Sequence, residues 1–361
     1  MHLVPYIAAI EAGVMTVMAS YNSWNGDKVH GHHGLLTGVL KEELGFRGFV
    51  VSDWMGIDQI DSSYETSVVT AINAGVDMVM VPDNYRRFIE VMIGATSTGL
   101  IPMHRIDDAV RRILTAKSSI GLFGPQPELP PLATVGSPEH RALAAEAVRR
   151  SAVLLKNDRA LPIPSGIATI DVAGQAADNI GLQCGGWTVG WQGGSGPITA
   201  GNTLLDGLHA STVGNVEYDP TGRFSNRDRG DVGIVCVAES PYAEGPGDCA
   251  APVASDEDRA VFARMRDRSD KLVLVIYSGR PLIIPDLIEQ ADAAVAAWLP
   301  GSEGASLAGL LAGVYPFEAR TSQPWPGSLA DLGKTDATPL FATGHGLDLT
   351  KTRPASPLES R

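Results

Sequence analysis

Short apolar runs alternate with helical stretches along most of this 361-residue chain. The apolar runs are continuous, which is typical of strands that are buried on both faces of a sheet. Strands that are separated by helices pair in parallel, because a parallel neighbour is reached through a crossover. The sequence therefore predicts an α/β fold whose parallel sheets are covered on both faces.

Three strand-and-helix units are expected in residues 1–122. The expected strands are residues 14–20, a buried strand, and residues 49–52 and 78–81. An amphipathic stretch at residues 7–13 comes first, and the expected helices are residues 35–44, 64–74, 85–93 and 106–116. A complete (β/α)8 barrel needs about 250 residues, and this region supplies about half of that. It does not close a barrel by itself.

A proline cluster at residues 125–131 cannot be a helix or a central strand and marks a boundary. We expect residues 123–150 to be a linker and a connecting helix, the helix being residues 140–150. Residues 151–361 are predicted to form a doubly wound α/β sandwich domain with a mainly parallel sheet. Its expected strands are residues 152–155, 168–172, 232–238, 272–277 and 293–299, with helices that include residues 256–266 and 302–311. From Tyr315 onward, Pro, Gly and Ser predict a weakly structured tail.

Composition excludes several functional classes. The 28 Lys and Arg against 41 Asp and Glu give a net charge of −13, and no basic run is present, which argues against a nucleic-acid partner. The longest apolar stretches, residues 272–277 and 293–299, are too short to span a membrane. The three cysteines lack the spacing of a zinc site or a disulfide framework.

Two carboxylates follow strands at positions where parallel α/β folds bind substrates. Asp53 ends the strand at residues 49–52, and Glu244 lies in a Gly- and Pro-containing loop after the strand at residues 232–238. By position alone, Asp53 also fits a helix N-cap and Glu244 a solvated loop residue. Trp54 beside Asp53 favours a sugar site, since an aromatic face next to a carboxylate suits a sugar ring.

A glycine-rich loop carries two further tryptophans, Trp187 and Trp191. The loop is too irregular for a helix, so these side chains serve either as a stacking platform or as packing. The His30–His33 run is the sole metal-like cluster, and no further ligands at compatible spacing are nearby, so we expect loop contacts or solvated histidines and no metal. Residues 190–196 lack the ending of a phosphate-binding loop, and Ser278 lacks a nucleophile elbow. No cofactor is predicted.

Several ordered runs resemble glycoside hydrolase family 3, above all its β-glucosidases and exo-acting β-glucan hydrolases. The resemblance covers about residues 5–315. The runs that carry it are TVMASYNSWNG (16–26), LGFRGFVVSDW (44–54), NAGVDMVM (73–80), RRIL (111–114), AVLLKN (152–157), GGWT (185–188), YAE (242–244) and LPGSEG (299–304).

The resemblance implies a two-domain retaining glycosidase that releases glucose from the non-reducing end of β-glucans or β-glucosides. Asp53 matches the catalytic nucleophile and Glu244 the general acid/base. Trp54 and Trp187 match the pair that clamps a sugar ring, and Tyr21 matches a residue beside the nucleophile. A retaining mechanism needs the two carboxyl groups about 5–5.5 Å apart. The second domain would therefore have to dock over the barrel.

The resemblance also implies that part of the family's barrel has no counterpart here. Residues 1–122 match the C-terminal part of a (β/α)8 barrel, starting near the sixth strand. The upstream segments that hold the sugar hydroxyls are not matched, and Gln59 stands where relatives often carry Arg. We therefore expect an N-terminally truncated reading frame or gene fragment, in which Met1 is an internal methionine.

Three readings remain open from the sequence. The chain is a β-glucosidase or exo-glucanase, or it is an inactive or carbohydrate-binding fragment that lacks the glycone pocket. The third is a β-N-acetylhexosaminidase, which draws its acid/base from the barrel, and Glu244 in the YAE run speaks against it. The N-terminus has no signal-peptide pattern. A periplasmic or secreted location is expected from the resemblance, and the oligomeric state is not indicated.

Overall fold

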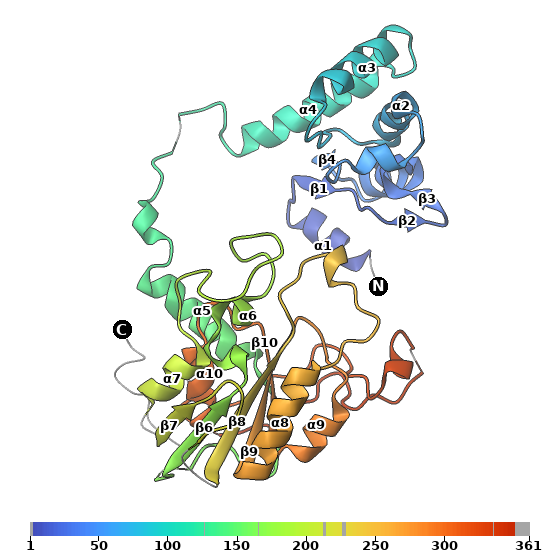
Figure 1. The fold of residues 1–361 in the computed structure, drawn as a ribbon. Coiled ribbons are helices and arrows are strands. Elements are labelled where there is room, and N and C mark those ends of the chain that lie inside the picture. The colour runs from blue at the N-terminus through green and yellow to red at the C-terminus, as the bar shows by residue number, and fades with distance from the viewer. Residues whose placement is uncertain are drawn as a thin grey trace. The chain divides into compact units, whose positions relative to one another are not determined.

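The computed structural model describes residues 3–125, 127–164, 166–211, 214–225, 229–334 and 336–350. The chain divides into two compact units, Met1–Pro130 and Pro131–Arg361, so the division falls inside the proline cluster. Both units combine helices with strands (Figure 1). No described helix is both long enough and apolar enough to cross a bilayer.

The first unit has little sheet and several helices. Strands β1 (Thr16–Met18) and β4 (Phe49–Val51) pair in parallel, and β2 (Ser23–Trp24) and β3 (Asp27–Lys28) form a hairpin. The helices are α1 (Val4–Glu11), α2 (Tyr64–Ala74), α3 (Tyr85–Ser97) and α4 (Met103–Ser119), with a π-helix η2 (Gly34–Glu43) and short 3-10 turns η1 (Val29–Gly31) and η3 (Gly56–Gln59). The hairpin was not predicted, although its Asn25-Gly26 turn is a recognised signal. Both residues have positive φ, which that dipeptide tolerates.

Two strand predictions for the first unit were wrong in part. Residues 78–81 do not form a strand, and only Met78 bridges to Val51. The hydroxyl of Ser52 accepts the N–H of Met80 at 2.8 Å, so a side chain replaces the next bond of the ladder. The first strand was predicted to be buried, but Met18 is 52% exposed. In the described unit β1 pairs with β4 alone, and its outward side chains are left uncovered.

A buried ionic cluster holds β4 against the helices. The side chain of Asp77 is fully buried, contacts Lys41 and Arg105, and accepts the N–H of Val50 at 2.8 Å. Burial lowers the pKa of Lys41 to about 8, although Asp77 opposes this effect. Since Val50 lies in β4, the cluster fixes the strand that leads into Asp53. Removing one partner of such a buried cluster leaves an uncompensated charge, so all its members are needed.

The second unit contains a six-stranded sheet in the order β5-β10-β9-β8-β6-β7. All neighbouring strands are parallel except the β5–β10 pair, in agreement with a mainly parallel sheet. The strands are β5 (Val153–Asn157), β6 (Thr169–Ala173), β7 (Asn215–Tyr218), β8 (Gly230–Ala238), β9 (Ser269–Tyr277) and β10 (Ala293–Trp298). The edge strand β7 was not predicted, because it is short and only half-buried.

Helices lie against both faces of this sheet. Alternate residues of β9 belong to different cores: Val273 and Val275 pack with one set of helices, and Leu272 and Leu274 with the other. The first set includes α5 (Pro138–Ser151), α7 (Leu204–Ala210) and α10 (Ala305–Leu311). The second set includes α8 (Asp256–Arg268) and α9 (Pro285–Gln290). The continuous apolar strands thus reflect burial from both sides.

The described residues after Tyr315 hold little regular secondary structure, namely the short turn η7 (Leu329–Asp331) and isolated bridges, as predicted, but two of their side chains pack into the cores, which was not predicted. Phe317 and Trp325 are both fully buried, one in each core. The indole N–H of Trp325 donates to the carbonyl of Leu282 at 2.8 Å, and Phe317 forms a backbone bridge with Leu349. The segment has no periodic pattern, because isolated large side chains, rather than a helix or strand face, fill the edges of the cores.

Asp292 connects β9 with the start of β10 through hydrogen bonds. Its surroundings allow a prediction of how the stability of the fold depends on pH. Its carboxylate accepts bonds from Arg266 at 2.6 Å, Lys271 at 2.9 Å and the N–H of Leu272 at 2.9 Å. Burial raises the pKa of Asp292, but these donors outweigh it and lower the pKa to about 2.

A carboxyl group with a lowered folded-state pKa stabilises the fold above its unfolded value. This contribution is lost as the pH falls from about 4 to about 2. We expect Asp292→Asn to lower the free energy of unfolding by about 1–2 kcal/mol at pH 7 and by much less at about pH 2.5, the value being limited by solvent screening. Urea unfolding at both pH values measures this, with Asp256→Asn on the surface as control. An equal loss at both pH values would contradict the assignment.

Candidate active site

Asp53 follows β4 and is held by four hydrogen bonds, one of which its carbonyl accepts from the N–H of Gly56 at 3.0 Å. Its backbone N–H donates to Nε2 of His30 at 3.0 Å, and its carbonyl accepts the hydroxyl of Ser52 at 2.8 Å. Its Oδ1 accepts the N–H of Trp54 at 2.6 Å. The backbone on both sides of the carboxylate is therefore fixed by groups of the fold. Asp53 as a whole is half-buried.

His30 lies in η1 and is only 1% exposed. Burial lowers its pKa, the nearby Asp53 opposes this, and Lys28 adds to it. A neutral imidazole can accept the N–H of Asp53 at Nε2, whereas a protonated one cannot. A Cβ at Gly56 would lie 2.4 Å from this nitrogen, so only glycine leaves room for the ring. His30 is the loop contact that was expected, and it is not a solvated histidine.

Tyr21 and Trp54 lie near the same residues. The ring of Tyr21 meets the ring of His30 edge-on, with centroids 5.9 Å apart. Trp54 is 60% exposed, so within its unit the indole is not core packing. Met55 follows with a positive φ of 53°, which turns the backbone sharply after the tryptophan. The first unit thus places Asp53, Trp54 and Tyr21 around one buried histidine.

Glu244 lies in the loop after β8, and its side chain is exposed. Its φ is +53° and its ψ is −143°, a conformation that side chains rarely adopt. The carbonyl of Glu244 accepts the N–H of Gly247 at 2.8 Å, which closes a tight turn. Strained backbone of this kind persists only where surrounding contacts impose it, and it concentrates at functional sites.

The contacts that impose this conformation on Glu244 come from the glycine-rich loop that carries Trp187 and Trp191. Gln192 bonds Ala243 in both directions: its Nε2 donates to the carbonyl and its Oε1 accepts the N–H, each at 3.0 Å. A Cβ on Gly186 would lie 2.0 Å from the carbonyl oxygen of Tyr242, so the two loops touch through bare backbone. Trp187, 68% exposed, is therefore carried by a loop packed against the one that carries Glu244.

A second set of contacts fixes the base of the Glu244 loop. Arg280 bonds Glu239 at 2.7 Å and the carbonyl of Gly247 at 2.8 Å, and it lies 4.5 Å from the centroid of the Tyr242 ring. The hydroxyl of Tyr242 donates to Glu239 at 3.0 Å. Burial, and then the Glu239 carboxylate, raise the pKa of Tyr242 to about 12, so the phenol remains a donor.

Family comparison agrees with the division into two units. Residues 1–116 match the glycosyl hydrolase family 3 N-terminal domain, and residues 152–349 match the glycosyl hydrolase family 3 C-terminal domain. The second match alone covers more than half of the chain. The chain belongs to glycosyl hydrolase family 3.

Several relatives in this family are similar over nearly the whole chain. The lysosomal β-glucosidase of Dictyostelium discoideum is 32% identical, over 94% of this chain and 46% of that protein. The periplasmic β-glucosidase of Salmonella typhimurium is 30% identical, over 92% of this chain and 48% of that protein. The crystal structure of the exo-1,3/1,4-β-glucanase ExoP from a Pseudoalteromonas species is 36% identical with a TM-score of 0.87, over 98% of this chain and 48% of that one. The chain spans about half the length of the curated relatives it matches.

The structure therefore forms two groups of candidate residues in this family member. Asp53, Trp54 and Tyr21 lie together in the first unit, and Glu244 and Trp187 lie on adjoining loops of the second. Sequence reasoning expected His30 as a loop contact without linking it to Asp53, and it missed Gln192, Glu239 and Arg280, which hold the Glu244 loop. The described residues contain no group of three His, Cys, Asp or Glu that could hold a metal ion.

Proposed function

We propose that this chain carries the nucleophile and the acid/base of a retaining β-glycosidase, which releases glucose from the non-reducing end of β-glucans or β-glucosides. The observation that supports this most is the carboxylate of Asp53. It stands at the end of a parallel strand, accepts the N–H of Trp54, and lies beside an exposed indole, while the backbone N–H of the same residue donates to His30. Relatives at 30–36% identity are named β-glucosidases or an exo-glucanase.

In the first step, Asp53 attacks the anomeric carbon of the sugar. Among the described residues its Oδ1 accepts the N–H of Trp54 and its Oδ2 has no protein donor, so Oδ2 is the attacking atom. As the C–O bond to the sugar forms, the glycosidic bond breaks, and the carboxyl of Glu244 gives its proton to the leaving oxygen. A glycosyl ester on Asp53 and a free alcohol result.

In the second step, water hydrolyses the ester. The carboxylate of Glu244 takes a proton from the water while the oxygen of that water bonds to the anomeric carbon. The bond between the sugar and Asp53 breaks, and the carboxylate of Asp53 is released. The sugar is released with its original anomeric configuration. Trp54 and Trp187 offer exposed indole faces to the sugars beside the cleaved bond, and Tyr21 stands beside the nucleophile.

The fold assignments belong to the same proposal. We assign residues 1–122 to the C-terminal part of a (β/α)8 barrel, residues 123–150 to a linker and connecting helix, and residues 151–361 to an α/β sandwich domain. The parallel β1–β4 pair and the two-sided sheet support this. We also propose an exported protein, since the relatives include a periplasmic and a lysosomal enzyme. A fragment that binds carbohydrate without turnover is not favoured by those matches.

A mechanism-based label tests the proposed nucleophile. A 2-deoxy-2-fluoro-β-glucoside with a good leaving group forms the glycosyl ester but turns over slowly. We expect the mass of the intact chain to rise by one fluoroglucosyl group and peptide mapping to place it on Asp53. The Asp53→Asn variant should remain unlabelled. A folded chain that takes up no label, or takes it up elsewhere, would contradict the proposal.

A further inference from the structure

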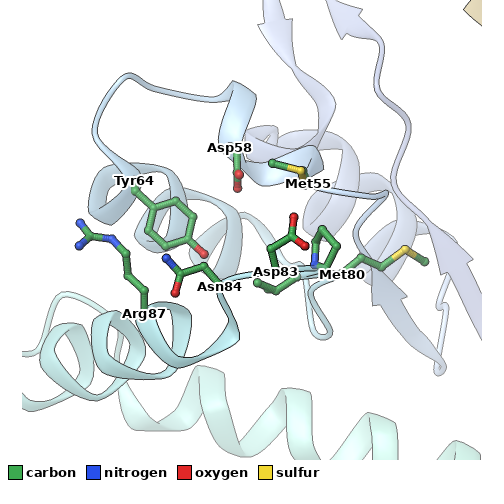
Figure 2. A pocket seen from close by; sticks show the side chains of 9 residues that line it. Met55, Asp58, Tyr64, Met80, Asp83, Asn84 and Arg87 are labelled. Atoms are coloured by element: carbon green, nitrogen blue, oxygen red, sulfur yellow. The ribbon is translucent and has the colours of Figure 1, made fainter.

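A cavity of about 170 Å³ lies in the first unit, beside the turn that follows Trp54. Its walls come from η3, from the start of α2 and from the segment that enters α3 (Figure 2). The lining residues are Met55, Asp58, Tyr64, Met80, Val81, Pro82, Asp83, Asn84 and Arg87. The cavity is smaller than the roughly 300–1,000 Å³ that is typical for drug-sized ligands. Its size suits one small ring.

Four polar side chains of the cavity make no hydrogen bond with any described residue. They are Asp58, Tyr64, Asp83 and Asn84, and Figure 2 shows the two carboxylates pointing into the same space. Burial and the nearby Asp58 raise the pKa of Tyr64, so its hydroxyl remains a donor. Asp58, Asp83 and Asn84 are exposed and Tyr64 is half-buried, so two acceptors, a donor and an amide that can do both face one open space and are available to a ligand.

The helix that borders the cavity departs from ordinary helix chemistry. Asn84 occupies the N-cap of α3, yet its side chain makes no capping bond. The first turn carries Arg86 and Arg87 and no acidic residue, although a helix N-terminus favours negative charge. Arg87, which also lines the cavity, pairs with Glu65 at 2.7 Å. Departures from local rules are expected at functional sites.

The chemistry of the walls identifies the class of ligand. Two carboxylates disfavour an anion. A metal ion is disfavoured because the cavity offers only two carboxylates and Arg87 stands at its rim. Met55, Met80 and Pro82 and the ring of Tyr64 provide an apolar wall opposite these acceptors. A neutral ring with several hydroxyls on its edge and C–H groups on its face can bond the acceptors and also pack against the apolar wall.

We infer that this cavity is an accessory binding site for a single pyranose ring, separate from the carboxylate of Asp53. Asp58 and Asp83 accept bonds from ring hydroxyls, Asn84 bonds a further one, and Tyr64 lines the apolar side. The inference rests on the proposed function in one respect, which is that a glycosidase meets sugars as ligands. The ring can come from free glucose or from the end of a glucan chain, and these share the same recognition chemistry.

Calorimetric titration of the full chain with glucose tests the site. The double variant Asp58→Asn/Asp83→Asn should bind glucose at least about tenfold more weakly, since bonds to charged groups are the strong ones. The control Glu90→Gln/Asp107→Asn removes the same charge from exposed positions of α3 and α4 and should bind as the native chain does. Methyl β-glucoside as second titrant, used with the Asp53→Asn variant so that it is not hydrolysed, separates the sources: binding equal to that of glucose indicates a chain end, and loss of binding indicates the free sugar.

Further variants keep the outcomes distinguishable. If the double variant does not fold, Tyr64→Phe retains the ring and should bind about threefold more weakly. Trp187→Ala should weaken laminaribiose binding and leave the glucose event at the cavity unchanged. Glucose binding that is absent, or that is unaffected in a folded double variant, would overturn the inference. Failure of the proposed function would instead show as no fluoroglucosyl adduct on Asp53, with glucose binding at the cavity intact.

Discussion

Asp53→Asn lowers kcat for an aryl β-glucoside by about 10⁴-fold or more, while the chain remains folded. The amide oxygen of asparagine is a very poor nucleophile, so no glycosyl ester forms. The substitution is otherwise mild, because an asparagine Oδ1 still accepts the N–H of Trp54. The bond from the backbone N–H at position 53 to His30 does not involve the side chain. Steady-state kinetics and thermal melting of the same samples measure both effects.

The matched control for this prediction is Asp27→Asn. Asp27 lies exposed in β3 and is not one of the candidate residues, so the variant loses the same charge and keeps the carboxylate of Asp53. It should keep native kcat and a native melting temperature. An Asp53→Asn variant that retains more than about a hundredth of native kcat would remove Asp53 from the role of nucleophile.

Glu244→Gln lowers kcat/KM for β-glucosides with poor leaving groups by about 10²–10⁴-fold. A glutamine cannot give a proton to the leaving oxygen, and alkyl alcohols and sugars leave only when protonated. Dinitrophenyl β-glucoside needs no such help, so its kcat/KM should change little. We expect the loss of kcat/KM to be large for poor leaving groups and small for good ones. Measuring kcat/KM across a series of leaving groups therefore reports the proton transfer from Glu244.

Two further variants locate the origin of this effect. Gln192→Ala removes both bonds to Ala243 and should give a weaker form of the same leaving-group dependence, because Glu244 is then less well placed. Glu257→Gln, at the start of α8, removes an acidic side chain elsewhere in the unit and should behave like the native chain. Equal losses on good and poor leaving groups in Glu244→Gln would show that Glu244 is not the acid.

Elements with strong local patterns were predicted well. The helix at residues 64–74 agrees with α2 to the residue, because Ser63 caps it and Gly75 ends it. The central strands of the second unit, such as β8 and β9, were confirmed, since continuous apolar runs are visible without knowledge of their partners. These signals depend only on residues that are near one another in the chain.

Elements that depend on distant partners were predicted poorly. Residues 78–81 lost their strand because a side chain, Ser52, took the bond that a backbone group would have made. The packing of the tail was not predicted, because Trp325 is buried by α9 and its neighbours, which lie far away in sequence. Neither effect leaves a periodic pattern, so no local rule could have found it.

The sequence by itself determined the α/β class and the apolar strands, because hydrophobic period is a property of the chain alone. Its resemblance to glycoside hydrolase family 3 identified Asp53, Glu244, Trp54, Trp187 and Tyr21 as candidates. The tertiary structure decided how each candidate is held, through His30 behind Asp53 and through Gln192 and Arg280 around Glu244. These contacts join residues 23, 51 and 33 positions apart in the sequence, and only folding brings them within hydrogen-bond distance. A buried polar group is stable only when such a partner is present, so the positioning of the site is a product of packing.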